Sequence, residues 1–377
     1  MIKELAAKIA NEKIRPVREE LDRKGEFPRQ ILNALAEADL FRIFIPEEYE
    51  GMGEKCVDLC VVVEEISKAC GGVAVSYAAS SLGATPIMLY GSEEQKKKYL
   101  PQIASGKKLA AFGLTEPNAG SDAGSLATTA RLDGNEWVLN GTKVFITNGG
   151  EADIYSVIAI TNKAKGPRGA SFFIVEKGTP GFSFGKEEDK MGIRCSATRE
   201  LIFDNCRIPK ENIINKEGMG FIIAMATFDH SRPGIGAQAV GIAAGALEEA
   251  IRYANERVQF GQSISSFQAI QHKLADVATQ IEAARALVYA VARMLDGKRQ
   301  KSYTKESAMA KLFASDVAMR TTIECQQVLG GYGYMREYPM EKYVRDAKIS
   351  QIYEGTNEIQ RNVIAAELIK ESKKKKK

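Results

Sequence analysis

Apolar residues recur every three to four positions through the first hundred residues of the chain. This spacing is typical of amphipathic helices, which we expect over residues 29–41 and 56–70, with a glycine-containing break between them. Residues 71–89 differ, because small and apolar side chains occur there with no charge. Glycine and proline interrupt this stretch too often for a membrane helix, and no apolar run is expected to span a membrane. We expect a buried bundle helix, a wall of an apolar ligand cavity, or both.

The periodicity changes near residue 109. Short segments rich in β-branched and aromatic residues follow, each bounded by turn residues, at residues 136–150, 153–161, 170–177 and 199–209. Within the first of them, Asn140-Gly141 is a dipeptide that favours a tight hairpin turn. The middle third therefore predicts a small antiparallel β-domain.

The helical period returns after Gly220. Long amphipathic segments at residues 239–258, 267–295 and 306–329 suit a helical bundle. A final helix is expected to start at a cap formed by Thr356 or Asn357. We therefore expect a mainly α-helical chain with a central β-domain, divided at residues 1–106, 107–215 and 216–377.

This order of elements differs from the alternating βαβ pattern of a dinucleotide-binding fold. Residues 234–239, "GIGAQA", match a relaxed dinucleotide fingerprint, but a long helical segment follows and no strand precedes them. We predict that these small residues serve helix packing.

Composition narrows the class of protein. The chain has 377 residues, 45% hydrophobic and 27% charged, as expected for a globular protein. Its net charge of +4 comes partly from a C-terminal lysine run, which we predict to be a disordered, solubilising end without nucleic-acid binding. Six scattered cysteines and two histidines provide no zinc-type ligand set, which predicts no metal and a reducing compartment. The N-terminus lacks a signal-peptide pattern, so we expect the cytoplasm.

Several loops combine glycines with hydroxyl, cationic or aromatic side chains, at residues 114–125, 144–150, 257–261 and 327–333. Loops of this composition can present backbone N–H groups to a phosphate or a polar ring, although each alone also fits an ordinary turn. Residues 351–360, "QIYEGTNEIQ", place Glu354 just ahead of the expected final helix. Alone, this acid could be a surface charge.

Taken together and in this order, the segments resemble the acyl-CoA dehydrogenase family over essentially the whole chain, from "IPEEYEG" through "LTEPNAGSD", "KMGIRCSATRELIFDNCRIP", "ERVQFG" and "LGGYGY" to "RDAKISQIYEGTNEIQRNVIA". The resemblance implies an N-terminal helical domain, a middle β-barrel-like domain and a C-terminal four-helix bundle. It also implies that FAD is held between them and shared across subunits of a homo-oligomer, usually a tetramer.

The same resemblance implies the chemistry. Glu354 would remove the α-proton of a saturated acyl-CoA while the β-hydride moves to flavin N5, giving a trans-2-enoyl-CoA, with electrons passed on to an electron-transferring flavoprotein. The implied FAD contacts are Phe112, Leu114, Thr115, Gly120, Ser121, Phe145, Thr147, Arg257, Gln259, Phe260, Gln268, Gln327, Gly331, Thr356 and Glu358. The implied substrate contacts are Ser121, Phe228, Asp229, Arg232, Tyr353 and Gly355. Arg232 would meet the nucleotide portion of CoA, although a surface salt bridge is the alternative.

The sequence leaves related activities open. An acyl-CoA oxidase usually has a longer chain, and flavin monooxygenases or nitroalkane oxidases of this fold usually lack "YEGT" or the arginine. A cofactor-free scaffold or CoA-binding protein would purify colourless. Residues 71–95 contain no Lys or Arg to pair with a distal carboxylate, so an uncharged linear, branched or cyclic acyl group is expected over a dicarboxylic one. Phe145 stands where many relatives carry Trp, which removes an indole N–H and could alter docking of the redox partner.

Overall fold

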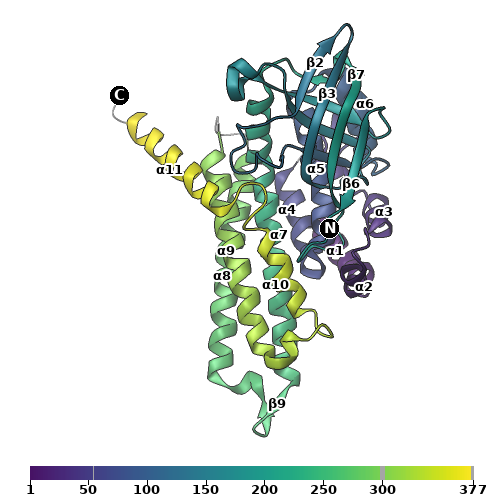
Figure 1. Ribbon diagram of the computed structural model, residues 1–377. Coiled ribbons are helices and arrows are strands. Elements are labelled where there is room, and N and C mark those ends of the chain that lie inside the picture. Colours follow the sequence, from purple (N-terminus) through teal and green to yellow (C-terminus); the bar gives the residue numbers. More distant parts are fainter. Residues whose placement is uncertain (54, 298–301, 375–377) are drawn as a thin grey trace.

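The computed structural model describes residues 1–53, 55–297 and 302–374. Helices form both ends of the chain, and a sheet lies between them in sequence (Figure 1). The segments that join these parts run between residues 104 and 110 and between residues 214 and 220, so both predicted boundaries fall in connections between elements.

The N-terminal part is helical, as the periodicity predicts. Its α-helices are α1 (Ile2–Ile9), α2 (Arg18–Lys24), α3 (Arg29–Glu37), α4 (Cys56–Ala69), α5 (Gly71–Tyr90) and α6 (Glu93–Ala104). The α6 helix begins with a capping box, in which the Ser92 and Gln95 side chains exchange hydrogen bonds with each other's backbone N–H groups.

The α5 helix corrects one expectation. Among the described residues it is long and apolar enough to cross a membrane by length and composition, so an apolar run of that length does occur. However, 78% of its apolar window is buried inside the protein, as is common for a core helix. Packing against α4, α7 and the sheet accounts for its composition, so this helix is weak evidence for a membrane span.

The strands described between residues 110 and 214 form one sheet in the order β6-β7-β3-β2-β4-β5-β8, with β1 paired to β4. They are β1 (Ala110–Gly113), β2 (Thr129–Asp133), β3 (Glu136–Thr147), β4 (Ile154–Ile160), β5 (Ala170–Glu176), β6 (Phe182–Glu187), β7 (Thr198–Pro209) and β8 (Ile213–Ile214). The prediction of an antiparallel domain was wrong for β4, which pairs in parallel with both β1 and β2. The β2–β3 hairpin separates β1 from β4 in sequence and lets them run in the same direction.

The predicted hairpin turn at Asn140-Gly141 was also wrong, because β3 continues through these residues. A register irregularity occurs there against β7, between Leu139 and Gly141. Gly141 has φ +142°, and a Cβ at this position would lie 2.6 Å from Thr128 Oγ1. The chain instead turns at Gly134, between β2 and β3. Gly141 therefore permits a close approach inside a long strand that pairs on both sides.

The C-terminal part is built from α7 (Gly220–Glu256), α8 (Gln268–Asp296), α9 (Thr304–Leu329), α10 (Met340–Ile349) and α11 (Asn357–Lys374). Figure 1 shows α7, α8 and α9 side by side, ending in the short hairpin of β9 (Val258–Gln259) and β10 (Gln262–Ser263) far from α11. Residues 234–239 lie inside α7, where a Cβ on Gly236 would come within 2.7 Å of Val288 Cγ2, which confirms the helix-packing prediction.

The predicted cap of the last helix is confirmed, since Ile359 N–H donates to Thr356 Oγ1 at 3.3 Å. The α11 helix then extends to Lys374. The prediction of a disordered lysine tail was therefore wrong for the residues up to Lys374. Residues 375–377 lie outside the described chain.

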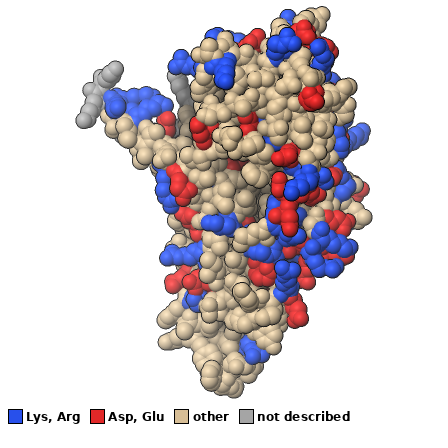
Figure 2. Space-filling view, viewed as in Figure 1, with Lys and Arg blue, Asp and Glu red and all other residues tan. Residues whose placement is uncertain are grey.

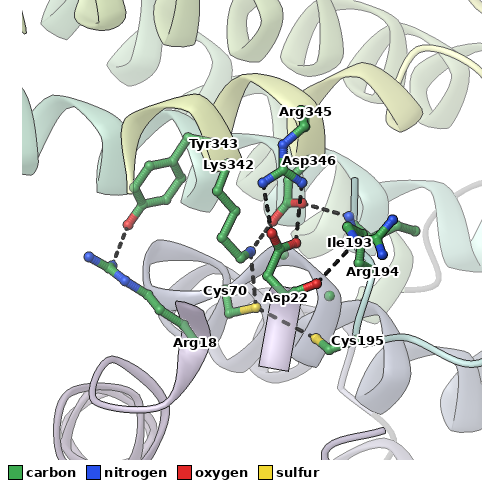
Figure 3. Close-up of polar contacts among 12 residues, drawn as sticks. Arg18, Asp22, Cys70, Ile193, Arg194, Cys195, Lys342, Tyr343, Arg345 and Asp346 are labelled. Atoms are coloured by element: carbon green, nitrogen blue, oxygen red, sulfur yellow. Dashed lines mark hydrogen bonds and ion pairs between the residues drawn. The ribbon is translucent and has the colours of Figure 1, made fainter. Parts of the chain in front are cut away.

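A network that we call the three-way junction joins the parts of the molecule through Arg18, Asp22, Lys342, Arg345 and Asp346 (Figure 3). It also includes Glu249, which accepts a hydrogen bond from Arg18. Arg345 Nη2 on α10 lies 2.7 Å from Asp22 Oδ2 on α2, and Asp346 Oδ1 accepts a 2.6 Å hydrogen bond from Ile193 N. Lys342 pairs with Asp346 on the same helix. These contacts hold α10 in place, and the loop that carries Glu354 follows α10 directly.

Candidate active site

A cavity of about 530 Å³ lies where α5, α7, the loop after β1, the end of β3 and the loop before α11 meet. One apolar wall is formed by Leu59 on α4 and by Val75, Ala78, Ala79 and Leu82 on α5. The α5 helix is therefore both a buried bundle helix and a cavity wall, so both sequence interpretations of residues 71–89 are confirmed.

Glu354 lines this cavity from the loop between α10 and α11. Its backbone has φ +51°, an uncommon conformation for a non-glycine residue. Ser231 Oγ on α7 donates a 2.5 Å hydrogen bond to Glu354 Oε2. The loop is held through its carbonyl groups, because Gln360 Nε2 donates to the carbonyls of Glu354 and Gly355 at 3.1 and 2.9 Å.

Lys311 on α9 also contacts the loop that carries Glu354. Its Nζ donates to the Gly355 carbonyl at 2.8 Å and to Asn357 Oδ1 at 2.9 Å. Burial lowers the pKa of Lys311 to about 7, although the Glu354 charge acts in the opposite direction. A buried lysine whose partners are mostly uncharged is therefore poised near neutral pH.

Burial likewise raises the pKa of the Glu354 carboxyl group above its ordinary value. The Ser231 hydrogen bond and the positive charges of Arg232 and Lys311 act in the opposite direction and favour the carboxylate. Desolvation makes a carboxylate a stronger base, while these neighbours keep it ionisable. From the sequence alone, Glu354 could have been a surface charge. Its position in the cavity and its raised pKa instead suit an acid–base group.

Arg232 lies beside this carboxylate and is only 4% exposed, which argues against a surface salt bridge. Its guanidinium is 3.7 Å from Asp229 Oδ1 and stacks 5.6 Å from the ring centre of Phe228. Its buried Nε has no hydrogen-bond partner among the described residues. Burial lowers the pKa of Arg232. A buried cation with spare donor capacity is suited to meet an oxygen atom of a ligand.

The mouth of the cavity is polar. Thr115, Ser121 and Thr147 line it, and their hydroxyl groups take part in none of the hydrogen bonds found among the described residues. Phe145 lies beside them with φ +59° and a side chain that is 66% exposed. Free hydroxyls around an exposed aromatic face fit a flat, polar heterocycle such as the flavin of FAD.

A buried ion pair anchors the loop after β1 that carries these groups. Lys143 Nζ lies 2.6 Å from Glu116 Oε1 and donates to the Leu114 carbonyl at 3.1 Å. Glu116 also accepts hydrogen bonds from the backbone of Ala127 and Thr128. This charge is fully paired, so it positions the loop and leaves the neighbouring hydroxyls available.

A second pocket of about 480 Å³ lies at the end of the bundle near β9. Arg257, Gln259 and Gly331 line it, and the Arg257 guanidinium stacks 5.5 Å from the ring centre of Tyr332. A Cβ on Gly331 would meet no atom within 4 Å, so the surface is open there. In Figure 1 this end lies far from the loop before α11, so one chain does not bring these residues to Glu354.

The remaining predicted contacts lie outside both pocket linings. Phe260 is exposed in the β9–β10 turn, and Gln268 and Gln327 are exposed on α8 and α9. Thr356 and Glu358 lie at the start of α11, and Asp229 lies beside Arg232 on α7. The predicted residues that do line the main cavity are Phe112, Leu114, Thr115, Gly120, Ser121, Phe145, Thr147, Phe228, Arg232, Tyr353, Glu354 and Gly355.

Sequence reasoning missed Ser231, Lys311 and Gln360, which contact Glu354 or its loop. One signal was available for Lys311, because it stands among small residues on the apolar stripe of a helix, between Ala308 and Ala314. A charge at such a position needs a buried partner, and the partner is the backbone of the loop that carries Glu354. Ser231 precedes Arg232 but carries no comparable signal.

Comparisons with known proteins agree with this architecture. The model of the acyl-CoA dehydrogenase N-terminal domain matches residues 1–107, that of the middle domain residues 111–206 and that of the C-terminal domain residues 218–369. An acyl-CoA dehydrogenase of Bacillus subtilis is 49% identical over 370 residues, which cover 98% of this chain and 97% of that protein.

Two solved structures are similarly close. A chain in the structure of the electron transferring flavoprotein of Acidaminococcus fermentans is 52% identical, with a TM-score of 0.96 over 98% of this chain and 97% of that one. Butyryl-CoA dehydrogenase from Megasphaera elsdenii is 46% identical, with a TM-score of 0.95 over the same shares. The chain described here belongs to the acyl-CoA dehydrogenase family, whose members are FAD-dependent oxidoreductases.

Proposed function

We propose that this chain dehydrogenates a saturated acyl-CoA at its α,β-bond, with Glu354 as the base that takes the α-proton. The single observation that supports this most directly is the position of Glu354. It is an acid with one side-chain hydrogen-bond donor, set in a cavity with an apolar wall from α4 and α5. An acyl chain in that cavity would displace water from the carboxylate and raise its basicity further.

The residues around the cavity mouth fit FAD. Thr115, Ser121, Phe145 and Thr147 would hold the flavin end, and bound FAD supplies an acceptor for the hydride that leaves the β-carbon. We propose that Arg257, Gln259 and Gly331 hold the other end of a FAD molecule in a second copy of the chain, because they lie far from Glu354 in their own.

The shared cofactor supports a proposal of a homotetramer. The bundle end near β9 shows few charged side chains in Figure 2, and Phe260, Tyr332 and Tyr334 are exposed there. Elsewhere on this face, Lys and Arg are interspersed with Asp and Glu, and this mixture is densest over the helices near the N-terminus (Figure 2). An apolar end beside mixed charge is typical of a surface that meets another subunit.

We propose an uncharged acyl group of short to medium length. Among the described residues that line the cavity, Arg232 is the one cation, and it lies at Glu354 rather than along the apolar wall from α5. A distal carboxylate would therefore be buried without a partner. The similarity to butyryl-CoA dehydrogenase supports the same choice. Contact between Arg232 and the nucleotide of CoA, with Asp229 beside it, stays a prediction.

The physiological context is also a proposal. The likeness to a chain in an electron transferring flavoprotein structure supports such a flavoprotein as the electron acceptor. The free cysteines fit a reducing compartment, for which we propose the cytoplasm and a role in β-oxidation.

An anaerobic absorbance titration tests the proposal. The purified protein should be yellow, and butyryl- to octanoyl-CoA should bleach its flavin band, while Glu354→Gln should bind the same thioesters without bleaching. A colourless protein that fails to take up FAD would refute the proposal. Bleaching retained in Glu354→Gln would refute the assignment of the base alone.

A further inference from the structure

Two thiols meet inside the three-way junction and have no part in the proposed dehydrogenation. Cys70 and Cys195 are 0% and 1% exposed, and their sulfur atoms lie 3.8 Å apart (Figure 3). Cys70 comes from the N-terminal helices, and Cys195 from the segment between β6 and β7. Lys342 Nζ on α10 donates to Cys70 Sγ at 3.2 Å. Three separate parts of the chain thus converge on one sulfur atom.

The geometry favours the thiolate form of Cys70. The Cys195 thiol is placed to donate to it, the Lys342 ammonium lies beside it, and Cys70 is the N-cap of the 20-residue helix α5. A helix N-terminus and a neighbouring cation both stabilise a thiolate. The hydrogen bond from Cys195 lowers the pKa of Cys70 to about 6, with Lys342 acting in the same direction against burial and Asp346.

The approach of the two sulfur atoms depends on Gly72. A Cβ at this position would lie 2.6 Å from Cys195 Sγ, so any larger residue would push the thiol away. The missing side chain therefore makes room for the second sulfur directly beside the first turn of α5.

The other thiols have a different environment. A hydrogen bond with Cys56 and burial raise the pKa of Cys60, and the acids Asp296 and Glu64 act in the same direction. Burial raises the pKa of Cys206 to about 11 and that of Cys325 to about 12. These thiols are as buried as Cys70, so their thiolate fractions distinguish them. Because the thiolate is the nucleophile, a small oxidant that reaches them should react with Cys70 first.

We propose that Cys70 and Cys195 are a peroxide-reactive pair that forms a reversible disulfide between the N-terminal helices and the β-domain. The Cys70 thiolate attacks one oxygen of a hydroperoxide, and the O–O bond breaks, which gives a Cys70 sulfenic acid and releases water from hydrogen peroxide. The Cys195 sulfur then attacks the Cys70 sulfur, the S–O bond breaks, and a second water leaves. Two thiols and one hydrogen peroxide give one disulfide and two waters, with the peroxide reduced by two electrons.

The test treats the holoenzyme with hydrogen peroxide, blocks remaining thiols with an alkylating agent and maps peptides without reduction. We expect a linked Cys70–Cys195 peptide, a fall in free thiols from six to four per chain, and reversal by dithiothreitol. Cys70 should react at least about tenfold faster than Cys60 or Cys325, in keeping with its larger thiolate fraction.

Isosteric variants assign the two roles. In Cys195→Ser, the sulfenic acid should persist on Cys70 and be trapped by dimedone, whereas Cys70→Ser should leave Cys195 reduced. Cys325→Ser is the matched control for a buried thiol and should form the linked peptide as the wild type does. Equal oxidation of all buried thiols would overturn the proposal. The proposal would also be overturned if Cys70 oxidised to a sulfinic acid or became linked to Lys342 while Cys195 could still be alkylated.

Discussion

The cavity around Glu354 and the three-way junction both contain acidic and basic side chains, but these side chains have different partners in the two regions. The junction pairs its acids with cations, whereas Glu354 and Lys311 form hydrogen bonds with neutral groups. In the junction, Glu249 accepts from Arg18 Nη2 at 2.8 Å and from Arg15 Nη1 at 3.2 Å, and Asp22 is bridged by Arg345. In the cavity, Glu354 accepts from one hydroxyl, and Lys311 donates to a carbonyl and an amide oxygen instead of a carboxylate.

The difference separates structural charges from reactive ones. A buried acid that is paired on several sides has little reason to change its protonation state, and removing it leaves its partners uncompensated. A partly buried acid with one hydroxyl donor, such as Glu354, is less fully compensated, and such a group is a candidate for acid–base chemistry. Glu249 is buried and Glu354 is partly buried, and it is their hydrogen-bond partners that separate the two acids most clearly.

The sharpest test of this comparison replaces each acid by its amide. Glu354→Gln should lower kcat by about 10²–10⁴-fold, since it removes the proposed general base. The same change should raise Tm, because a desolvated carboxylate is replaced by a neutral group of equal size. Glu249→Gln should do the reverse, with kcat unchanged and stability lower by about 3 kcal/mol, because Arg18 loses a buried counter-charge.

Both variants are measured for kcat with butyryl-CoA and for Tm by calorimetry as holoenzymes. If both variants had a lower Tm, or if both had a lower kcat, the proposed difference between the cavity and the three-way junction would be wrong.

Asp346→Asn extends the test within the junction. Asp346 pairs with Lys342 and accepts from Ile193 N, so the amide would leave the buried ammonium with only the Cys70 sulfur beside it. We expect a loss of about 3 kcal/mol of stability with kcat unchanged for the folded fraction. The matched control is Asp189→Asn, since Asp189 is an exposed acid paired with Arg194 and its loss should leave the unfolding midpoint unchanged.

Denaturant unfolding of both variants gives the comparison directly. An Asp346→Asn protein with wild-type stability but lower activity would instead make the junction part of the catalytic machinery.

These contrasts mark the limit of what the sequence predicts. Helices such as α8 follow from a regular apolar stripe, and Glu354 follows from its motif, because both signals are local in the chain. Pairing between residues far apart in sequence is not local. Asn140-Gly141 has the composition of a turn, yet β3 runs through it because β2 and β7 pair with it on both sides. Ser231 and Glu354 are 123 residues apart, and no local pattern in either segment predicts the hydrogen bond between them.

Lys311→Met tests a positioning residue of the cavity. The change removes the donors to the Gly355 carbonyl and Asn357, so the loop should hold Glu354 less firmly. We expect kcat to fall by about tenfold with a small change in KM, which corresponds to about 1.4 kcal/mol of transition-state stabilisation. The Lys311 charge also favours ionised Glu354, so its loss should move the acidic limb of the rate profile to higher pH.

That shift should be visible mainly below about pH 7, where Lys311 carries its charge in the wild type. A variant with lower kcat but an unmoved acidic limb would assign Lys311 a purely structural role.

The finest test concerns Ser231, whose single hydrogen bond to Glu354 Oε2 favours the carboxylate. In Ser231→Ala the pKa of Glu354 should rise further, because burial is then opposed only by Arg232 and Lys311. Below the new pKa more of the base is protonated and inactive, so kcat/KM at acidic pH should fall by a few fold up to about tenfold. Above it, the carboxylate is ionised and a stronger base, so the rate should equal or exceed that of the wild type. Ser231→Thr keeps the hydroxyl and should restore the wild-type profile, and a uniform fall in rate at every pH would show that Ser231 only packs against the loop.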